Sequence, residues 1–268
     1  MRKVSLFMDN YEKSVSTTPE KNAVIDLSFS TPIVLNYKEL NDWAERVATQ
    51  LLLLGVETDE FVTYQLPNGW EFIVLTLALW KIGAVPCPLL PSLREREVKT
   101  MLESSKSRIL VVTQEYRGFD YVEMAERIRA ELSQPLQVFT LDSCKRVLKA
   151  NQFGGLIGSD IRRDAIDERK PSSQTNAQLL YTWRSTGEPE GVLHTHETLS
   201  QLLNLYTQTL GVSKDEPMWV NAPLSHEIGF LYGMAVSLYS GTTGIYQENW
   251  EENVARKTVE TYLAMTAN

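Results

Sequence analysis

The sequence predicts an α/β fold, with mainly parallel sheets flanked by helices. Three observations favour this fold class. Short runs rich in β-branched residues alternate along the chain with longer segments whose apolar residues recur at helical spacing. Several of the short runs are apolar throughout, which is typical of strands buried on both faces. Strands that alternate with helices favour right-handed βαβ units and therefore parallel pairing.

The elements predicted up to residue 141 begin with a hairpin, because two β-branched runs, Ala23–Asp26 and Ile33–Asn36, are separated by serine and proline. A helix is expected over Leu40–Leu54, where apolar residues keep helical spacing until Gly55. Trp70–Ile82 is apolar almost throughout, so we expect a buried helix. The other strands expected in this part are Phe61–Leu66, Ala84–Pro88, Ile109–Thr113 and Leu136–Leu141, and the other helices are Arg94–Ser104 and Tyr121–Leu132.

The stretch Asn151–Asn176 has no sustained period and is rich in glycine, aspartate, arginine and serine, which predicts a long surface connection. Regular structure is expected to return beyond it. The strands predicted there are Ala177–Thr182, Met218–Asn221 and Thr243–Tyr246, and the helices are Glu197–Leu210, Gly229–Tyr239 and Val254–Tyr262. The last residues, Leu263–Asn268, resemble the opening of a further strand, so we expect the chain to stop before its domain is complete.

The composition is that of an ordinary globular protein, since 43% of the 268 residues are hydrophobic and 22% are charged. A formal net charge of −8 argues against a nucleic-acid partner, which would favour a basic face. The N-terminus lacks the apolar run of a signal peptide, and the most apolar window, Phe72–Leu79, is too short to span a membrane. Cys87 and Cys144 are far apart and are expected to be free thiols, with a disulfide as the alternative. We therefore expect a soluble, cytoplasmic protein.

Several residues are expected to be structural. The aromatic residues Trp43, Trp70, Phe72 and Trp80 are predicted to lie in the core. His194 and His196 lack further ligands at metal-site spacing, so no metal site is expected, and His196 is predicted to begin a helix.

The strongest chemical signal lies between Tyr181 and His196. A predicted strand leads into a turn of serine, threonine and glycine, followed by Pro189, Gly191, a short strand and a helix. Backbone N–H groups and hydroxyls in such a turn bind anions, and glycine allows the backbone to approach phosphate closely. The alternative is a plain structural turn. The similar string Ser240–Gly244 lacks the rest of the pattern, so we predict a structural turn there.

The stretch from Tyr181 to His196 resembles the phosphate loop of AMP-forming acyl-CoA synthetases and adenylation domains. The residues that match the family's loop are Thr182, Ser185, Thr186, Gly187, Pro189, Gly191, Val192, Thr195 and His196. The other stretches that resemble this family are Pro67–Phe72, Lys81–Pro86 with Pro88–Pro91, and Ala222–Gly233. The similarity runs from end to end of the chain but covers only the family's N-terminal half. Within the family, the sequence most resembles ligases for short-chain, medium-chain or cyclohexane-type carboxylic acids.

The resemblance implies a reaction in which a small carboxylic acid is activated with ATP and Mg²⁺ and is then passed to CoA. The residues that would contact the nucleotide phosphates are Thr182, Ser185, Thr186, Gly187 and Gly191. His226 and Gly229 would border the acyl group, although capping of the helix that follows is an open alternative for His226. The resemblance also implies a first α/β subdomain over residues 1–170 and the start of a second over 171–268, which carries the loop.

Three residues depart from the family's loop. Trp183 replaces a hydroxyl residue, Arg184 replaces a glycine and Glu190 replaces a lysine. A side chain where the glycine needs positive φ costs about 1 kcal/mol or more. Replacing lysine by glutamate changes the charge beside a polyanion by two units, worth several kcal/mol at an effective dielectric of about 20. Arg184 returns one positive charge, yet we expect no catalytic residue and no bound cofactor in this chain.

Two functions are consistent with these features. The first is the N-terminal piece of an AMP-forming carboxylate–CoA ligase, from a cut chain or an interrupted gene. It is expected to be inactive because the family's downstream residues for adenine, Mg²⁺ and ribose have no place before Asn268. The second is a non-catalytic remnant that binds a partner or an acyl-like ligand, which the loop substitutions favour for this polypeptide. An exposed sheet edge leaves association into a homodimer open.

Overall fold

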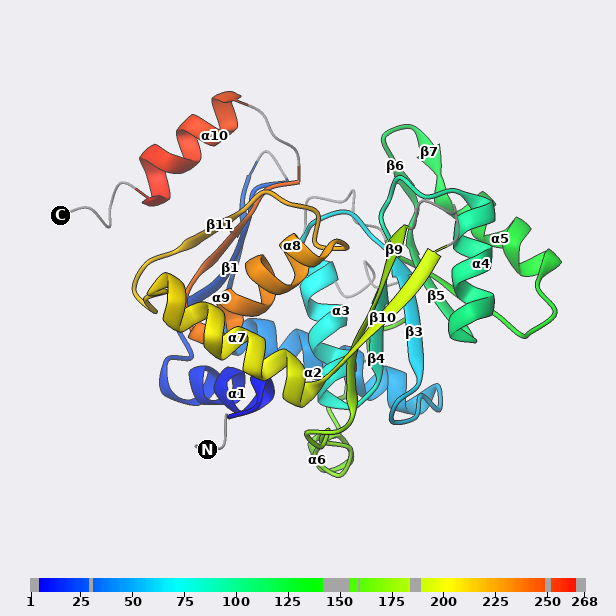
Figure 1. Cartoon of the computed structure of the whole chain (residues 1–268), viewed down its shortest axis with the longest axis horizontal. Helices are drawn as coiled ribbons and strands as arrows, with labels where there is room; N and C mark the ends of the chain where they lie inside the picture. Colours follow the sequence, from blue (N-terminus) through cyan, green and yellow to red (C-terminus); the bar gives the residue numbers. More distant parts are fainter. Residues whose placement is uncertain are drawn as a thin grey trace. The chain divides into compact units, whose positions relative to one another are not determined.

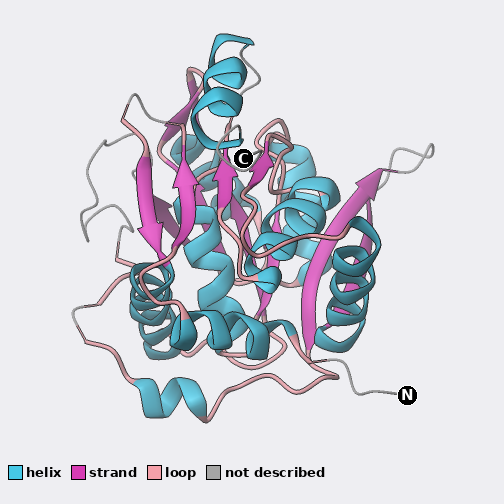
Figure 2. Cartoon of the chain, turned by 90° about the vertical axis from the view of Figure 1, so that its left-hand side faces the viewer, coloured by secondary structure: helices cyan, strands magenta, loops and turns pink. Residues whose placement is uncertain are grey.

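The computed structural model describes residues 5–28, 31–141, 155–158, 160–183, 189–248 and 252–263. The predicted fold class is confirmed, because the strands pair mainly in parallel and are flanked by helices (Figures 1 and 2). No helix within these ranges is long and apolar enough to cross a membrane.

The chain divides into two compact units. The terminal unit contains residues 1–41, 68–70 and 200–268, and the central unit contains residues 42–67 and 71–199. These units group residues by their packing and do not test the subdomain boundary predicted at residue 170. That boundary stays a prediction.

The central unit is built on a parallel sheet with the strand order β4-β3-β5-β8. Its strands are β3 (Phe61–Gln65), β4 (Val85–Pro88), β5 (Ile109–Thr113) and β8 (Gln137–Leu141). Each strand lies within the range predicted for it. Every residue of β5 is buried, as expected for a strand covered on both faces.

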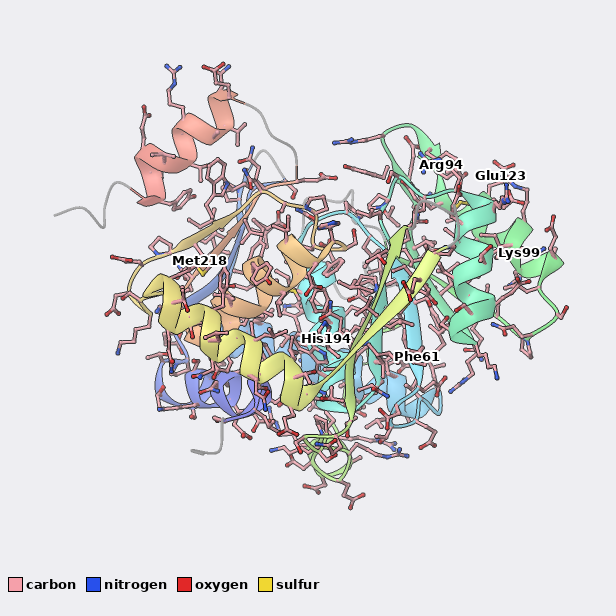
Figure 3. The ribbon with its side chains drawn as sticks, in the orientation of Figure 1. Phe61, Arg94, Lys99, Glu123, His194 and Met218 are labelled. Atoms are coloured by element: carbon pink, nitrogen blue, oxygen red, sulfur yellow. The ribbon has the colours of Figure 1, made fainter. Side chains whose placement is uncertain are left out.

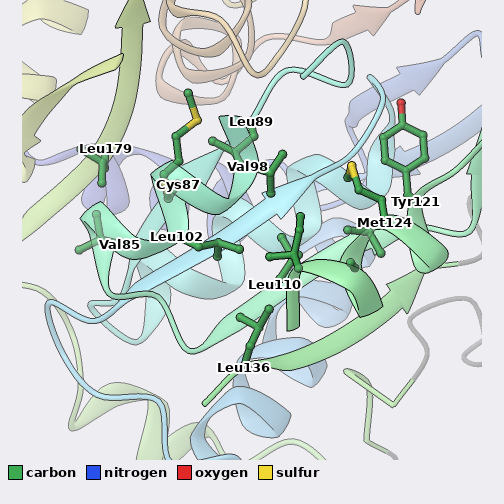
Figure 4. Packing of buried hydrophobic residues seen from close by; sticks show 14 residues of the cluster. Val85, Cys87, Leu89, Val98, Leu102, Leu110, Tyr121, Met124, Leu136 and Leu179 are labelled. Carbon is green, nitrogen blue, oxygen red and sulfur yellow. The ribbon is translucent and has the colours of Figure 1, made fainter. Parts of the chain in front are cut away.

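Helices α4 (Glu95–Ser105) and α5 (Tyr121–Glu131) contribute to the hydrophobic cluster of this sheet (Figure 4). Leu110 and Val112 of β5 share one face because side chains alternate along a strand, and they belong to the cluster together with Leu102 and Met124. Complete burial of such a side chain contributes about 1.5–3 kcal/mol. Cys87 is a free thiol in the same cluster, and burial raises its pKa to about 12. The thiol is therefore unreactive at neutral pH.

The remaining helices of this part of the chain are α2 (Tyr37–Leu53), α3 (Trp70–Lys81) and α6 (Arg163–Asp167). Three of the four aromatic residues predicted for the core, Trp70, Phe72 and Trp80, are buried, and Trp43 is half-buried. Cys144 lies outside the described residues.

The terminal unit contains a mixed sheet with the strand order β11-β12-β1-β2. Its strands are β1 (Asn22–Asp26), β2 (Ile33–Asn36), β11 (Met218–Val220) and β12 (Gly244–Tyr246). β1 pairs with β2 antiparallel, which confirms the predicted hairpin. On its other edge β1 pairs in parallel with β12, which is distant in sequence.

Two polar side chains connect the loops of the terminal unit. The buried Asp26 carboxylate accepts hydrogen bonds from the backbone N–H groups of Ser28 and Trp70, at 2.9 and 3.0 Å. Burial raises the pKa of this carboxyl, and the hydrogen bonds oppose that shift. The Trp70 N–H belongs to the first turn of α3, so Asp26 caps a helix from a remote position.

Asn68 is the second connecting residue. Its Nδ2 donates to the carbonyl oxygens of Ala222 and Gln247, at 2.9 and 3.3 Å. Its Oδ1 accepts from the backbone N–H of Leu224 at 2.7 Å. One side chain therefore fixes the backbone on both sides of Pro223.

Four elements were not predicted. They are α1 (Phe7–Thr17), the hairpin of β6 (Glu115–Tyr116) and β7 (Phe119–Asp120), and α6. The first N–H of α1, on Phe7, donates to the Ser200 hydroxyl at 2.9 Å, so the acceptor at the start of this helix is distant in sequence. In α6 the side chain of Ile166 is buried, so the predicted surface connection contains a short packed helix.

The helix predicted over Gly229–Tyr239 is composite. It consists of α8 (Glu227–Gly229), the π-helical turn η2 (Phe230–Ala235) and α9 (Val236–Ser240). A Cβ on Gly233 would lie 2.5 Å from Val220 Cγ1, so glycine allows η2 to lie close to β11. α9 ends at Gly241 with φ of 70°, the left-handed conformation common after a helix, and the structural turn predicted over Ser240–Gly244 is confirmed.

The last predicted helix, Val254–Tyr262, consists of α10 (Glu252–Thr258) followed by the π-helical η3 (Val259–Leu263). Residues 264–268, on which most of the further strand was predicted, lie outside the described residues.

Candidate functional site

The predicted phosphate loop connects the two strands of an antiparallel hairpin in the central unit (Figure 1). β9 (Asn176–Trp183) pairs with β10 (Pro189–Thr195), and β10 leads into α7 (His196–Leu210). Residues 184–188 lie outside the described residues. This range contains the predicted phosphate contacts Ser185, Thr186 and Gly187, and the substitution Arg184. The described part of the site is therefore the pair of strands that carries the loop.

β9 is anchored in the central unit, whereas β10 is exposed. Trp80 Nε1 donates to the carbonyl oxygen of Ala177 at 2.6 Å, and the Tyr181 hydroxyl donates to the carbonyl oxygen of Met101 at 3.1 Å. By contrast, residues 190–193 of β10 are exposed. His194, which is labelled in Figure 3, belongs to the same strand. One strand of the hairpin, β9, is thus held by hydrogen bonds within the central unit, whereas the other strand, β10, is exposed.

Thr182 and Glu190 are directly opposite each other where the two strands enter the loop. Both are exposed, and the Thr182 hydroxyl donates a long hydrogen bond of 3.5 Å to the carbonyl oxygen of Glu190. Directly opposite residues of antiparallel strands place their side chains on the same face, with Cβ atoms about 4.5–5.5 Å apart. A carboxylate therefore lies beside the hydroxyl that was predicted to contact phosphate. Among the described residues of the site, this carboxylate is unfavourable for a polyphosphate, because it repels negative charge.

Gly191 has a packing role in the hairpin. It is paired with Tyr181, and a Cβ at this position would lie 2.9 Å from Leu179 Cδ1 and 3.4 Å from Tyr181 Cε1. Glycine leaves room for these two side chains to pack across β10. The phosphate contact predicted for Gly191 stays a prediction.

His196 begins α7, as predicted, and its side chain is fully buried. Its backbone N–H donates to the carbonyl oxygen of Thr175 at 2.9 Å. The imidazole meets the Trp80 ring edge to face, with 6.4 Å between the ring centroids. Burial lowers the pKa of His196 to about 4, and the charge of Asp59 opposes this shift in part. The imidazole is therefore neutral at neutral pH and belongs to the packing at the base of the hairpin.

His226 lies at the start of α8 in the terminal unit, and its side chain is exposed. Its Nδ1 accepts a hydrogen bond from the backbone N–H of Ile228 at 3.3 Å, which is the contact of a helix cap. The structure thus contains the capping interaction that was the alternative for this residue. The acyl contact predicted for His226 stays a prediction.

Gly229 is buried where α8 passes the segment before it. A Cβ at this position would lie 2.1 Å from the carbonyl oxygen of Pro223 and 2.8 Å from that of Ala222. The segment cannot move away easily, because Asn68 holds it through hydrogen bonds on both sides of Pro223. The sequence showed Asn68 within a family-like turn, and asparagine between proline and glycine is typical of turns, but nothing local indicated its remote partners.

The Gly229→Ala variant is expected to lose about 1–3 kcal/mol of its free energy of unfolding, because the added methyl group overlaps backbone atoms. The measurement is urea unfolding followed by circular dichroism. Gly158→Ala is the matched control, because a Cβ there would lie no closer than 3.6 Å to any neighbouring atom. Equal midpoints for the two variants would show that Gly229 is not sterically required.

Known proteins resemble this chain over most of its length. The family model "AMP-binding enzyme" matches residues 11–266. The medium-chain fatty-acid–CoA ligase of Escherichia coli (strain K12) is 26% identical over 238 residues, which are 88% of this chain and 41% of that ligase. The 2-hydroxy-7-methoxy-5-methyl-1-naphthoate–CoA ligase of Streptomyces carzinostaticus is 30% identical, over 78% of this chain and 38% of that ligase.

A solved structure shares the fold. The N-terminal domain of FACL13 from Mycobacterium tuberculosis superposes with a TM-score of 0.78 at 22% identity, covering 96% of this chain and 60% of that one. This chain spans about two fifths of the length of the two curated relatives, with 41% and 38% of their residues aligned. Because the family model matches nearly the whole sequence, the chain belongs to the family of AMP-binding enzymes.

Proposed function

We propose that this chain is the N-terminal portion of an AMP-forming carboxylate–CoA ligase and that it does not activate a carboxylic acid by itself. Fatty-acid-like or aromatic carboxylic acids are the substrate class we propose for the whole reaction, with ATP, Mg²⁺ and CoA as its cofactors. The names of the two curated relatives, ligases for a medium-chain fatty acid and for a naphthoate, support this class. The buried free thiol of Cys87 is consistent with a reducing compartment such as the cytoplasm.

The position of Glu190 opposite Thr182 is the observation that carries the proposal. In carboxylate activation, Mg²⁺ and cationic groups stabilise the negative charge that develops at the α-phosphate. The Thr182 hydroxyl is able to donate to a phosphate oxygen, but the Glu190 carboxylate beside it repels the same oxygen. Relative to a lysine, this glutamate costs several kcal/mol at an effective dielectric of about 20. We therefore propose that the chain binds ATP weakly or not at all.

Isothermal titration calorimetry with ATP and Mg²⁺ tests the proposal. We expect no measurable binding by the natural sequence and an improvement of at least about tenfold when Trp183→Ser, Arg184→Gly and Glu190→Lys are combined. Glu131→Lys, which makes the same charge change as Glu190→Lys alone at an exposed site in the last turn of α5, is the control and should not improve binding.

Micromolar affinity of the natural sequence for ATP would overturn the proposal. No improvement in the combined variant would show that the loop substitutions are not what prevents binding.

A further inference from the structure

β10 has an outer edge that pairs with no strand among the described residues, because its sheet contains only β9 and β10. Figure 1 shows β10 beside β9. Val192 and Leu193 in the middle of β10 are 40% and 51% exposed. An edge strand with free backbone N–H and C=O groups and apolar side chains is a surface that pairs with another strand.

We propose that two copies of this chain associate by antiparallel pairing of their β10 strands, centred on Val192. The two hairpins then form one continuous four-stranded sheet. A two-fold interface of this kind presents the same surface from both copies, so every contact away from the axis occurs twice. This association goes beyond the proposed function, and it does not depend on nucleotide binding.

The side chains of β10 are complementary to themselves in this register. Val192 lies opposite Val192 of the second copy, and Glu190 lies opposite His194 of the second copy, where an imidazole N–H donates to a carboxylate oxygen. These three residues share one face of the strand, because side chains alternate along it. On the other face the small Gly191 lies opposite the large Leu193. Residues 190–194 therefore supply the apolar contact, the charged pair and the space for Leu193 that this register requires.

A shift of the axis by one residue removes this agreement. With the axis at Leu193, the apolar Val192 would lie opposite His194, and Glu190 would lie opposite His196, whose side chain is buried at the start of α7. This shift of the axis changes the pairing by two residues, so every side chain keeps its face and the register is specified by the side-chain partners alone. The second copy is the occupant that this pattern favours, because the side chains of residues 190–194 are complementary to those of the same segment in antiparallel orientation.

Sedimentation velocity tests the association. The natural sequence is expected to convert from monomer to dimer as its concentration rises. His194→Glu places a carboxylate opposite Glu190 of the second copy, and we expect the dissociation constant to rise at least about tenfold. The swap that combines Glu190→His with His194→Glu restores opposite partners and is expected to restore the dimer.

Far-ultraviolet circular dichroism checks that each variant is folded, which is expected because these β10 side chains are exposed or half-exposed. A natural sequence that stays monomeric at every concentration overturns the proposal. A dimer that His194→Glu does not weaken overturns it as well.

Cross-linking tests the register separately. Val192→Cys places two thiols directly opposite each other across the axis, so mild oxidation is expected to produce a covalent dimer. Leu193→Cys is the matched control, because its thiol lies opposite Gly191 and not opposite its own copy. Equal cross-linking of the two variants would overturn the proposed axis.

Discussion

The Glu45→Gln variant is expected to lower the free energy of unfolding by about 3–5 kcal/mol. Glu45 of α2 is nearly buried, and its Oε1 lies 3.5 Å from Lys81 Nζ of α3, whose side chain is only 5% exposed. Its Oε2 accepts a hydrogen bond from Arg163 Nε of α6 at 2.9 Å. Removal of the carboxylate leaves the Lys81 ammonium in a buried site without this counter-charge. A glutamine of nearly the same shape cannot supply that charge.

Urea unfolding of the variant, followed by circular dichroism, gives the size of this effect. Glu57→Gln is the control, because Glu57 forms an exposed ion pair with Arg169 and such pairs contribute little to stability. The combination of Glu45→Gln with Lys81→Met is expected to recover much of the loss, because it also removes the buried ammonium. Similar losses for Glu45→Gln and Glu57→Gln would contradict the assignment of a buried ion pair.

Acidification is expected to destabilise the natural protein by about 3 kcal/mol more than a His196→Gln variant. Burial lowers the pKa of His196 to about 4 from its usual 6.5. Between these two pH values the unfolded chain binds a proton that the folded protein does not bind. The stability contributed by the neutral imidazole is therefore complete above about pH 6.5 and is lost as the pH falls towards 4.

The measurement is the urea midpoint of both proteins at several pH values from neutral to about 4. The comparison with His196→Gln cancels the contributions of other titrating groups, such as the buried Asp26, whose pKa burial raises. Asp26 acts in the opposite direction, since a raised pKa favours the folded state as the pH falls. Parallel pH profiles for the two proteins would contradict a buried, neutral His196.

Most of the fold was accessible from the sequence because its strands and helices are set by local patterns. The apolar run Ile109–Thr113 was predicted with the bounds that β5 has in the structure. Two of the elements that were missed, α1 and α6, depend on remote partners. Phe7 in the first turn of α1 meets the Ser200 hydroxyl, and α6 is held by the ion pair of Arg163 with Glu45. The π-helical turn η2 keeps the apolar content of an α-helix, so its sequence pattern does not distinguish the two.

The candidate site was predicted less completely. The sequence placed a strand on each side of the loop, and it singled out Glu190 as a departure from the family. It could not give the register, because pairing of Glu190 with Thr182 depends on how the whole hairpin aligns. The sequence also could not distinguish a ligand contact from a packing role at Gly191, because either role requires a residue without a side chain. For His226, the capping bond to Ile228 depends on backbone geometry that residue types do not specify.

The long-range pairing of β1 and β12 has a consequence for the order of events during synthesis on the ribosome. The Thr243 hydroxyl donates to the carbonyl oxygen of Asn22, a residue 221 positions earlier. Closing so long a loop is slow, and it cannot begin until residue 246 has left the exit tunnel. The residues grouped in the central unit end at 199, so all of them are synthesised earlier. The N-terminal segment is made first, yet it is expected to wait longest for its native neighbours.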